Sequence, residues 1–134
     1  MILALATTGP TTELWLLPPG ATGLTTALSH EQWESERGLA DGLLSHIERL
    51  CLAQQSDINS LTGVVIMGGP GSFTSLRIGH TVANALADSL AIPVASGEGD
   101  NWMIDALKRL ATAKPGEPVW PFYGADVNVI RPKA

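Results

Sequence analysis

Cysteine, basic residues and long apolar runs are all scarce in this sequence. Cys51 is the only cysteine among 134 residues, so no internal disulfide can form, which favours a reducing compartment. Lys and Arg total 8 against 13 Asp and Glu, and this net charge of −5 lacks the basic footprint of a free-standing nucleic-acid-binding protein. No apolar run reaches the roughly 18 residues of a membrane span, and the apolar opening lacks the charged region of a signal peptide. These absences predict a soluble, cytoplasmic protein without a membrane contact.

Apolar residues make up 45% of the chain and charged residues 16%, which is typical of a folded domain. In the first third, short apolar or β-branched runs alternate with Gly and Pro turns, a pattern that predicts an antiparallel meander. Further along, a continuous apolar run predicts a strand that is covered on both faces. The predicted strands are 2–6, 13–17, 22–28, 62–67 and 92–96.

Three segments have helical spacing: 33–55, 73–91 and 100–111. The first carries an apolar face of Leu39, Leu43, Ile47 and Leu50. Two positions are possible for its start: a capping box formed by Ser29 and Gln32, or a start near Ser35. The negative charges of Glu31, Glu34 and Glu36 are favourable near the N-terminus of a helix. Asp100 is predicted to cap the third helix.

The predicted element order is therefore β-β-β-α-β-α-β-α, which places the chain in the α/β class. We expect a mixed sheet of about five strands with helices packed on it. Residues 1–112 form the predicted folded unit. The stretch 113–134 is rich in proline and glycine, and we expect it to be a linker followed by an extended tail.

A glycine-rich segment, Gly69–Gly79, lies between a predicted strand and a predicted helix, where a phosphate-binding loop would lie. It lacks the Gly-Lys-Ser/Thr ending of a P-loop, and Thr74 stands where a dinucleotide fingerprint needs its third glycine. Two interpretations of Gly68–Gly71 stay open: a tight turn, or an anion held by the N–H groups of the helix start. The tight turn is the simpler one.

Other catalytic patterns are missing too. His30, His46 and His80 are not spaced as paired zinc ligands on a helix, and a lone helical histidine is typical of a surface or an interface. Ser72 and Ser75 lack the surroundings of a nucleophile elbow, and Cys51 lies on the apolar side of its helix. We therefore predict no catalytic residues, no metal and no cofactor.

The second helix carries a stripe of small residues. They follow one another at steps of four: Ser75, Gly79, Ala83, Ala87 and Ala91. A stripe of large apolar residues runs beside it: Ile78, Val82, Leu86 and Leu90. The first helix has its own small pair, Gly38 and Gly42. Small side chains let another backbone approach closely, so these helices pack either on their own sheet or on a helix of another subunit.

The segment Gly69–Gly79 resembles the signature Gly-Pro-Gly-Ser-Phe-Thr-Gly-Leu-Arg-Ile-Gly of the bacterial TsaB (YeaZ) family. Only Ser75 departs from it. The resemblance extends in order through the opening strand, the helix at 35–50, and the segments 92–94 and 105–107, and more weakly to the tail. The signature loop, to which a structural role is assigned, comprises Gly69, Pro70, Gly71, Ser72, Phe73 and Thr74.

This resemblance implies a single actin-like lobe of the ribonuclease-H type, within the ASKHA superfamily. It implies a non-catalytic scaffold that activates TsaD, the subunit that makes N6-threonylcarbamoyladenosine at position 37 of tRNA. The implied contact uses helices 35–54 and 73–91. A TsaE ATPase joins the wider complex, tRNA is contacted only indirectly, and the chain alone pairs with itself. The implied interface residues are Gly38, Gly42, His46, Ser75, Gly79, Ile78, Val82, Ala83 and Leu86.

Two departures qualify the resemblance. Ala6 replaces an aspartate that positions metal and phosphate in active ASKHA members, which argues against nucleotide chemistry. The chain also passes from the third helix to the tail without a second lobe, so we expect a reduced subunit. The alternatives are a glycoprotease-like hydrolase or small nucleotide-binding protein that uses Gly68–Gly71, and a self-associating module without a TsaD partner.

Overall fold

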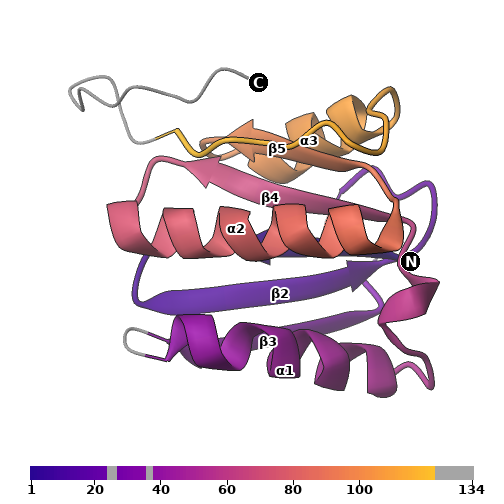
Figure 1. Cartoon of the computed structure of the whole chain (residues 1–134), viewed down its shortest axis with the longest axis horizontal. Coiled ribbons are helices and arrows are strands. Elements are labelled where there is room, and N and C mark those ends of the chain that lie inside the picture. Colours follow the sequence, from indigo (N-terminus) through magenta and orange to yellow (C-terminus); the bar gives the residue numbers. More distant parts are fainter. Residues whose placement is uncertain (24–26, 36–37, 123–134) are drawn as a thin grey trace.

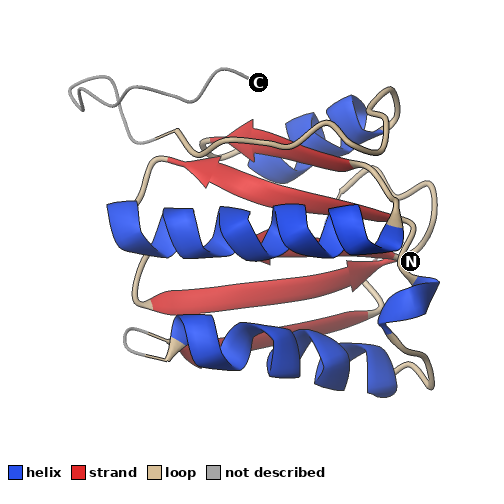
Figure 2. Cartoon of the chain, viewed as in Figure 1, coloured by secondary structure: helices blue, strands red, loops and turns tan. Residues whose placement is uncertain are grey.

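The computed structural model describes residues 1–23, 27–35 and 38–122, which form one sheet with helices on both of its faces (Figures 1 and 2). The strands and helices in chain order are β1 (Ile2–Ala6), β2 (Thr11–Leu17), β3 (Ser29–Glu34), α1 (Leu39–Leu52), the 3₁₀ turn η2 (Ile58–Ser60), β4 (Gly63–Gly69), α2 (Phe73–Leu90), β5 (Val94–Glu98) and α3 (Trp102–Leu110).

The strand order across the sheet is β3-β2-β1-β4-β5. β1 pairs with β2, and β2 with β3, in antiparallel register, as the tight turns predict. β1 pairs with β4, and β4 with β5, in parallel register. α2 makes the crossover from β4 to β5, whereas β2, β3 and α1 lie between β1 and β4 in the chain. The predicted mixed five-stranded sheet is confirmed.

Different helices pack on the two faces of the sheet. α1 and α2 lie side by side over one face, and α3 covers part of the other (Figure 1). The alternation along β1 divides its side chains accordingly: Leu3 and Leu5 pack under α1 and α2, whereas Ile2 and Ala4 pack on the α3 side. The continuous apolar run of β4 is explained in the same way, since both of its faces are buried.

The third strand is not where the sequence predicts it. The strand predicted at 22–28 lies instead at Ser29–Glu34, and residues 24–26 lie outside the described residues. Ser29 and Gln32 therefore do not form a capping box, and Glu31 and Glu34 belong to this strand rather than to the start of a helix. β3 is an edge strand with one face exposed. Its sequence is therefore polar and lacks the apolar residues from which a strand would be predicted.

The predicted helix boundaries also need correction. α1 begins at Leu39 and ends at Leu52, well inside the predicted 33–55 and 35–54, with residues 36–37 outside the described residues. Gly38 is its N-cap and makes no side-chain hydrogen bond, so it is not an interior helix glycine. Asn101, not Asp100, occupies the N-cap position of α3, again without a side-chain hydrogen bond.

After α3 the chain returns over the lobe in an extended form. Residues 113–122 contain neither helix nor strand, and the rest of the predicted tail, 123–134, lies outside the described residues. None of the helices in the described part of the chain has the length and apolar character needed to cross a membrane.

Candidate functional site

The signature loop joins the end of β4 to the start of α2 and packs against the β1–β2 turn. The N–H of Ser72 donates to the carbonyl of Thr8 at 2.7 Å, and the Ser72 hydroxyl caps α2 by accepting from the N–H of Ser75 at 3.5 Å. A Cβ on Gly71 would lie 2.5 Å from the same Thr8 carbonyl oxygen. Gly71 is therefore required by the close approach of two backbones.

Gly69 is required by its own backbone conformation and by a close contact. Its φ of +135° is rarely adopted by residues with a side chain, and a Cβ there would lie 1.9 Å from the Phe122 carbonyl oxygen. These contacts account for the glycines of the loop by packing alone, as a tight turn requires.

The small stripe of α2 faces the chain's own sheet. A Cβ on Gly79 would lie 1.9 Å from the Thr7 hydroxyl oxygen, and Ala83 and Ala87 are buried in the core beneath α1 and α2. Leu86 is buried in the same core. Gly79, Ala83 and Leu86, which were predicted at a partner interface, therefore pack against their own lobe in this structure and do not lie on its open surface.

The neighbouring flank of α2 is open. Ile78 and Val82 are half-buried, and together with Ala40 of α1 they line a hollow of about 250 Å³ between the two helices, which the exposed Arg77 and Thr81 also line. Leu44 lies one turn beyond Ala40 on the same side of α1 and is 46% exposed. We call Ala40, Leu44, Ile78 and Val82 the α1–α2 surface.

A second hollow of about 450 Å³ continues this surface towards the signature loop. Its lining comes from the β1–β2 turn and from the first turns of both helices: Gly9, Pro10, Leu39, Ala40, Ser72, Thr74, Ser75 and Ile78. The exposed Phe73 begins α2 beside these residues, with 47% of its surface accessible. The predicted interface residue Ser75 thus lies on an open part of the molecule, as Ile78 and Val82 do.

Of the other predicted interface residues on the first helix, Gly38 is the N-cap, Gly42 lies beside His46, and His46 packs against β3 on the opposite flank of α1. The His46 ring stacks on Trp33 with 3.8 Å between centroids, and its Nδ1 contacts the Glu31 carboxylate. Arg49 reaches the same carboxylate at 3.3 Å. A Cβ on Gly42 would meet the His46 ring at an ordinary 3.7 Å. This polar cluster fixes α1 to the edge strand.

The other two histidines and Cys51 lie at separate places in the described part of the chain. His30 stacks on Trp15 and pairs with Glu13 at 3.0 Å, on the other face of the sheet from His46. His80, expected at a surface or an interface, is instead buried. Burial raises the pKa of the Cys51 thiol, which suits a core residue. Within the described residues, no group of three or more His, Cys, Asp or Glu side chains is placed to hold a metal ion.

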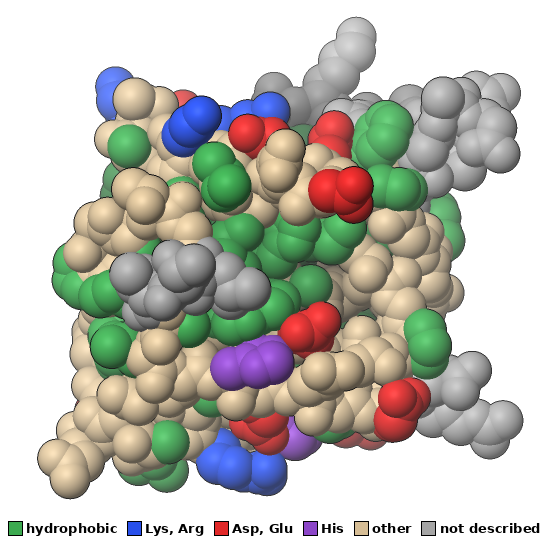
Figure 3. Space-filling view, turned by 180° about the vertical axis from the view of Figure 1, so that it is seen from behind, with side chains coloured by type: hydrophobic (Ala, Val, Ile, Leu, Met, Phe, Trp, Pro, Cys, Tyr) green, Lys and Arg blue, Asp and Glu red, His purple; other side chains and the backbone are tan. Residues whose placement is uncertain are grey.

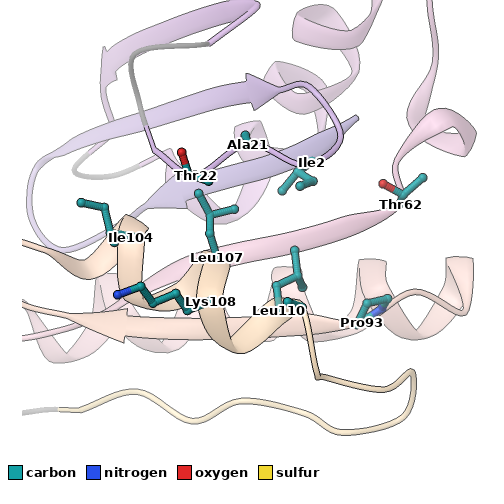
Figure 4. A pocket seen from close by; sticks show the side chains of 11 residues that line it. Ile2, Ala21, Thr22, Thr62, Pro93, Ile104, Leu107, Lys108 and Leu110 are labelled. Carbon is teal, nitrogen blue, oxygen red and sulfur yellow. The ribbon is translucent and has the colours of Figure 1, made fainter.

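The structure has an apolar hollow on the α3 side of the sheet that no sequence pattern predicted. It measures about 500 Å³ and lies between α3, the start of β1 and the turn after β2 (Figure 4). Ile2, Ile104 and Leu107 form its walls, and Lys108 stands at its rim. Apolar side chains gather in the middle of this face (Figure 3). Such a hollow depends on which elements meet, and local sequence patterns do not show that.

This sheet order and this layering define an actin-like, ribonuclease-H-type α/β lobe. Residues 34–96 match the profile of the family described as TsaD, tRNA N6-adenosine threonylcarbamoyltransferase. Two similar solved structures are YeaZ from Pseudomonas aeruginosa and an uncharacterized protein described as similar to peptidase YeaZ from the same organism. Each superposes with a TM-score of 0.60 at 29% sequence identity over 69% of this chain. No curated protein matches the sequence.

The signature and these structures make the chain similar to TsaB (YeaZ) proteins. It spans 41% of the length of the first relative and 40% of the second. Ala6 ends β1, at the position where the resemblance implies an aspartate in active members, and its methyl group packs with the α3-side core.

Proposed function

We propose that the chain is a non-catalytic partner of a TsaD-like threonylcarbamoyltransferase and that it serves the N6-threonylcarbamoyladenosine modification of tRNA. The similarity to YeaZ, the match to the TsaD profile and the signature loop support this pathway. The chain docks through its α1–α2 surface. Its place of action is the cytoplasm, tRNA is contacted only through the partner, and a TsaE-like ATPase joins the wider complex.

The observation that carries the docking role is the apolar, open character of the α1–α2 surface. Two neighbouring helices present the aliphatic groups of Ala40, Leu44, Ile78 and Val82 beside a hollow that Arg77 and Thr81 also line. Burying such groups against another helix pair releases roughly 25 cal/mol per Å² of apolar area. In the absence of the partner, the same surface pairs two copies of the chain.

Leu44→Asp is the sharpest test of this surface. The side chain is exposed, so the variant is expected to fold, while a carboxylate buried at an interface without a counter-charge is costly. We expect the affinity for a cognate TsaD-like protein, measured by calorimetry, to fall by at least about tenfold. Light scattering is expected to show the same loss for the homodimer.

The matched control is Ile104→Asp. Ile104 is 44% exposed, close to the 46% of Leu44, but it lies on α3 over the opposite face of the sheet. Ile104→Asp is expected to leave both associations unchanged. If Leu44→Asp bound as well as the unchanged chain, docking through α1 and α2 would be excluded.

The alternative of a hydrolase or a nucleotide-binding protein acting through Gly68–Gly71 has a simple test. Gly69 and Gly71 already contact the backbones of Phe122 and Thr8, so we expect no bound phosphate there. Melting temperatures with ATP, ADP and Mg²⁺ check this, since a ligand of the folded state raises them. A saturable rise would support the alternative.

A further inference from the structure

The helices that form the α1–α2 surface also carry exposed charges on their outer sides. Asp41 and Glu48 belong to α1, and Arg77 and Asp88 belong to α2. Within the described part of the chain, none of these four side chains makes a hydrogen bond or an ion pair. The other arginine of the two helices, Arg49, is engaged by a carboxylate of β3. The α1–α2 surface is therefore bordered by carboxylates, with a single guanidinium at Arg77.

Arg77 lies at the centre of this surface, because it lines the hollow together with Ile78 and Val82. Its guanidinium keeps its charge and presents several N–H donors in a plane, a geometry that matches a carboxylate. Covering such a group without a counter-charge is costly. Whatever covers the α1–α2 surface must therefore present a carboxylate close to apolar side chains.

The first helix of this chain offers that combination. Ala40, Leu44 and Glu48 follow one another at steps of four along α1, so the carboxylate lies one turn beyond the exposed leucine. The same surface thus contains both a guanidinium that needs a carboxylate and a carboxylate that has no partner. A surface that is complementary to itself fits a second copy of the chain related by a twofold axis.

The arrangement of the helices indicates which groups would meet. The first turns of α1 and α2 line one hollow, so both helices start at the same end of the lobe, and they lie side by side (Figure 1). A half-turn about an axis through the middle of the surface lays α1 of one copy over α2 of the other and reverses its direction. Arg77, near the start of α2, is then carried towards the end of the other α1, where Glu48 lies.

We propose that two copies of the chain pair across a twofold axis in which Arg77 of each copy contacts Glu48 of the other. The two ion pairs set the register of the helices, and the aliphatic groups of the α1–α2 surface are buried between them. Other registers leave the carboxylates of the two copies facing one another, which is unfavourable. This inference rests on the docking surface proposed above, and it names the second copy and the groups that align it.

A charge exchange on the full chain tests the pair. Arg77→Glu places like charges together at both contacts of the homodimer, and so does Glu48→Arg. Both positions are exposed, so both variants are expected to fold, which circular dichroism checks. Light scattering on dilution is expected to show dimers at least about tenfold weaker for each variant alone. An equimolar mixture of the two is expected to dimerise like the unchanged chain, because each contact again joins a guanidinium to a carboxylate.

Two matched variants separate this pair from a general effect of charge. Asp41→Arg lies at the other end of α1, so mixing it with Arg77→Glu is expected to restore no dimer. Lys108→Glu reverses an exposed charge on α3 and is expected to leave the dimer unchanged. An unchanged chain that stays monomeric, single variants that dimerise normally, a mixture of Arg77→Glu with Glu48→Arg that stays monomeric, or rescue by Asp41→Arg would each overturn the proposal. Loss of dimer in Leu44→Asp alongside any of the last three results would retain the docking surface and exclude only the pairing.

Discussion

His80 is a buried ionisable residue on the inner side of α2. Its Nδ1–H donates to the Leu76 carbonyl at 2.8 Å, and its Nε2 has no hydrogen-bond partner among the described residues. Burial lowers the pKa of His80 from its ordinary 6.5, and the hydrogen bond to Leu76 opposes this only in part. The folded chain therefore keeps this imidazole neutral where the unfolded chain protonates it.

This difference predicts acid sensitivity. Below about pH 6.5 the unfolded state binds a proton that the folded state rejects, so the free energy of unfolding falls as the pH drops, until His80 protonates in the folded chain as well. One such group contributes at most about 1.4 kcal/mol per pH unit. We expect His80→Phe to reduce the loss of stability between pH 7 and pH 5, measured by urea unfolding.

The comparison variant is His30→Gln, at an exposed histidine on β3. It is expected to keep most of the acid sensitivity of the unchanged chain. An unaltered pH dependence in His80→Phe would place the acid-sensitive group elsewhere.

Spacing identifies which residues share a face, but not what that face touches. The step of four from Gly79 to Ala83 and Ala87 correctly predicts one stripe on α2. The Thr7 side chain beneath Gly79 directly follows β1, more than seventy positions earlier in the chain, and it lies against the stripe. Because no local pattern reports that contact, the stripe was assigned to a partner as readily as to the sheet.

At the scale of elements, the strands with the strongest apolar signal were predicted best. β1 is predicted to the residue, and β4 and α2 to within two residues, because each has a buried face and strong turn residues at its ends. β3 was missed, since an edge strand pairs through its backbone and needs few apolar side chains. Its anchors, His30 on Trp15 and Trp33 on His46, are contacts across the sheet and to α1 that spacing cannot show.

The extended segment after α3 shows a related limit. Its proline content predicts an extended chain, and residues 113–122 contain neither helix nor strand, with a turn at 115–116. Two hydrogen bonds join the Asn84 amide to the backbone of Val119, 35 positions further along the chain, so the sequence alone does not show where the segment lies. The exposed α1–α2 surface was also predicted only in part. Ile78 and Val82 were predicted as interface residues, but Ala40 and Leu44 were not, because their place on this surface depends on how α1 packs beside α2.

For the molecule as a whole, the two faces of the sheet are unequally covered. Two helices, α1 and α2, cover one face, and Leu43 has no exposed surface there. α3 alone covers the other face and leaves a hollow that Leu107 lines. A large-to-small substitution costs most where the surrounding residues cannot relax or admit water. The α3 side therefore has the more tolerant core.

The same change at the two sites measures this difference. Leu43→Ala is expected to lower the free energy of unfolding by about 3–5 kcal/mol, because it leaves a closed cavity beneath α1. Leu107→Ala is expected to cost less, about 1–3 kcal/mol, because its side chain lines a hollow that is already open. Urea unfolding of both variants provides the values. An equal or larger loss at Leu107 would mean that α3 is packed as tightly as α1, and that the hollow beside it does not loosen the core.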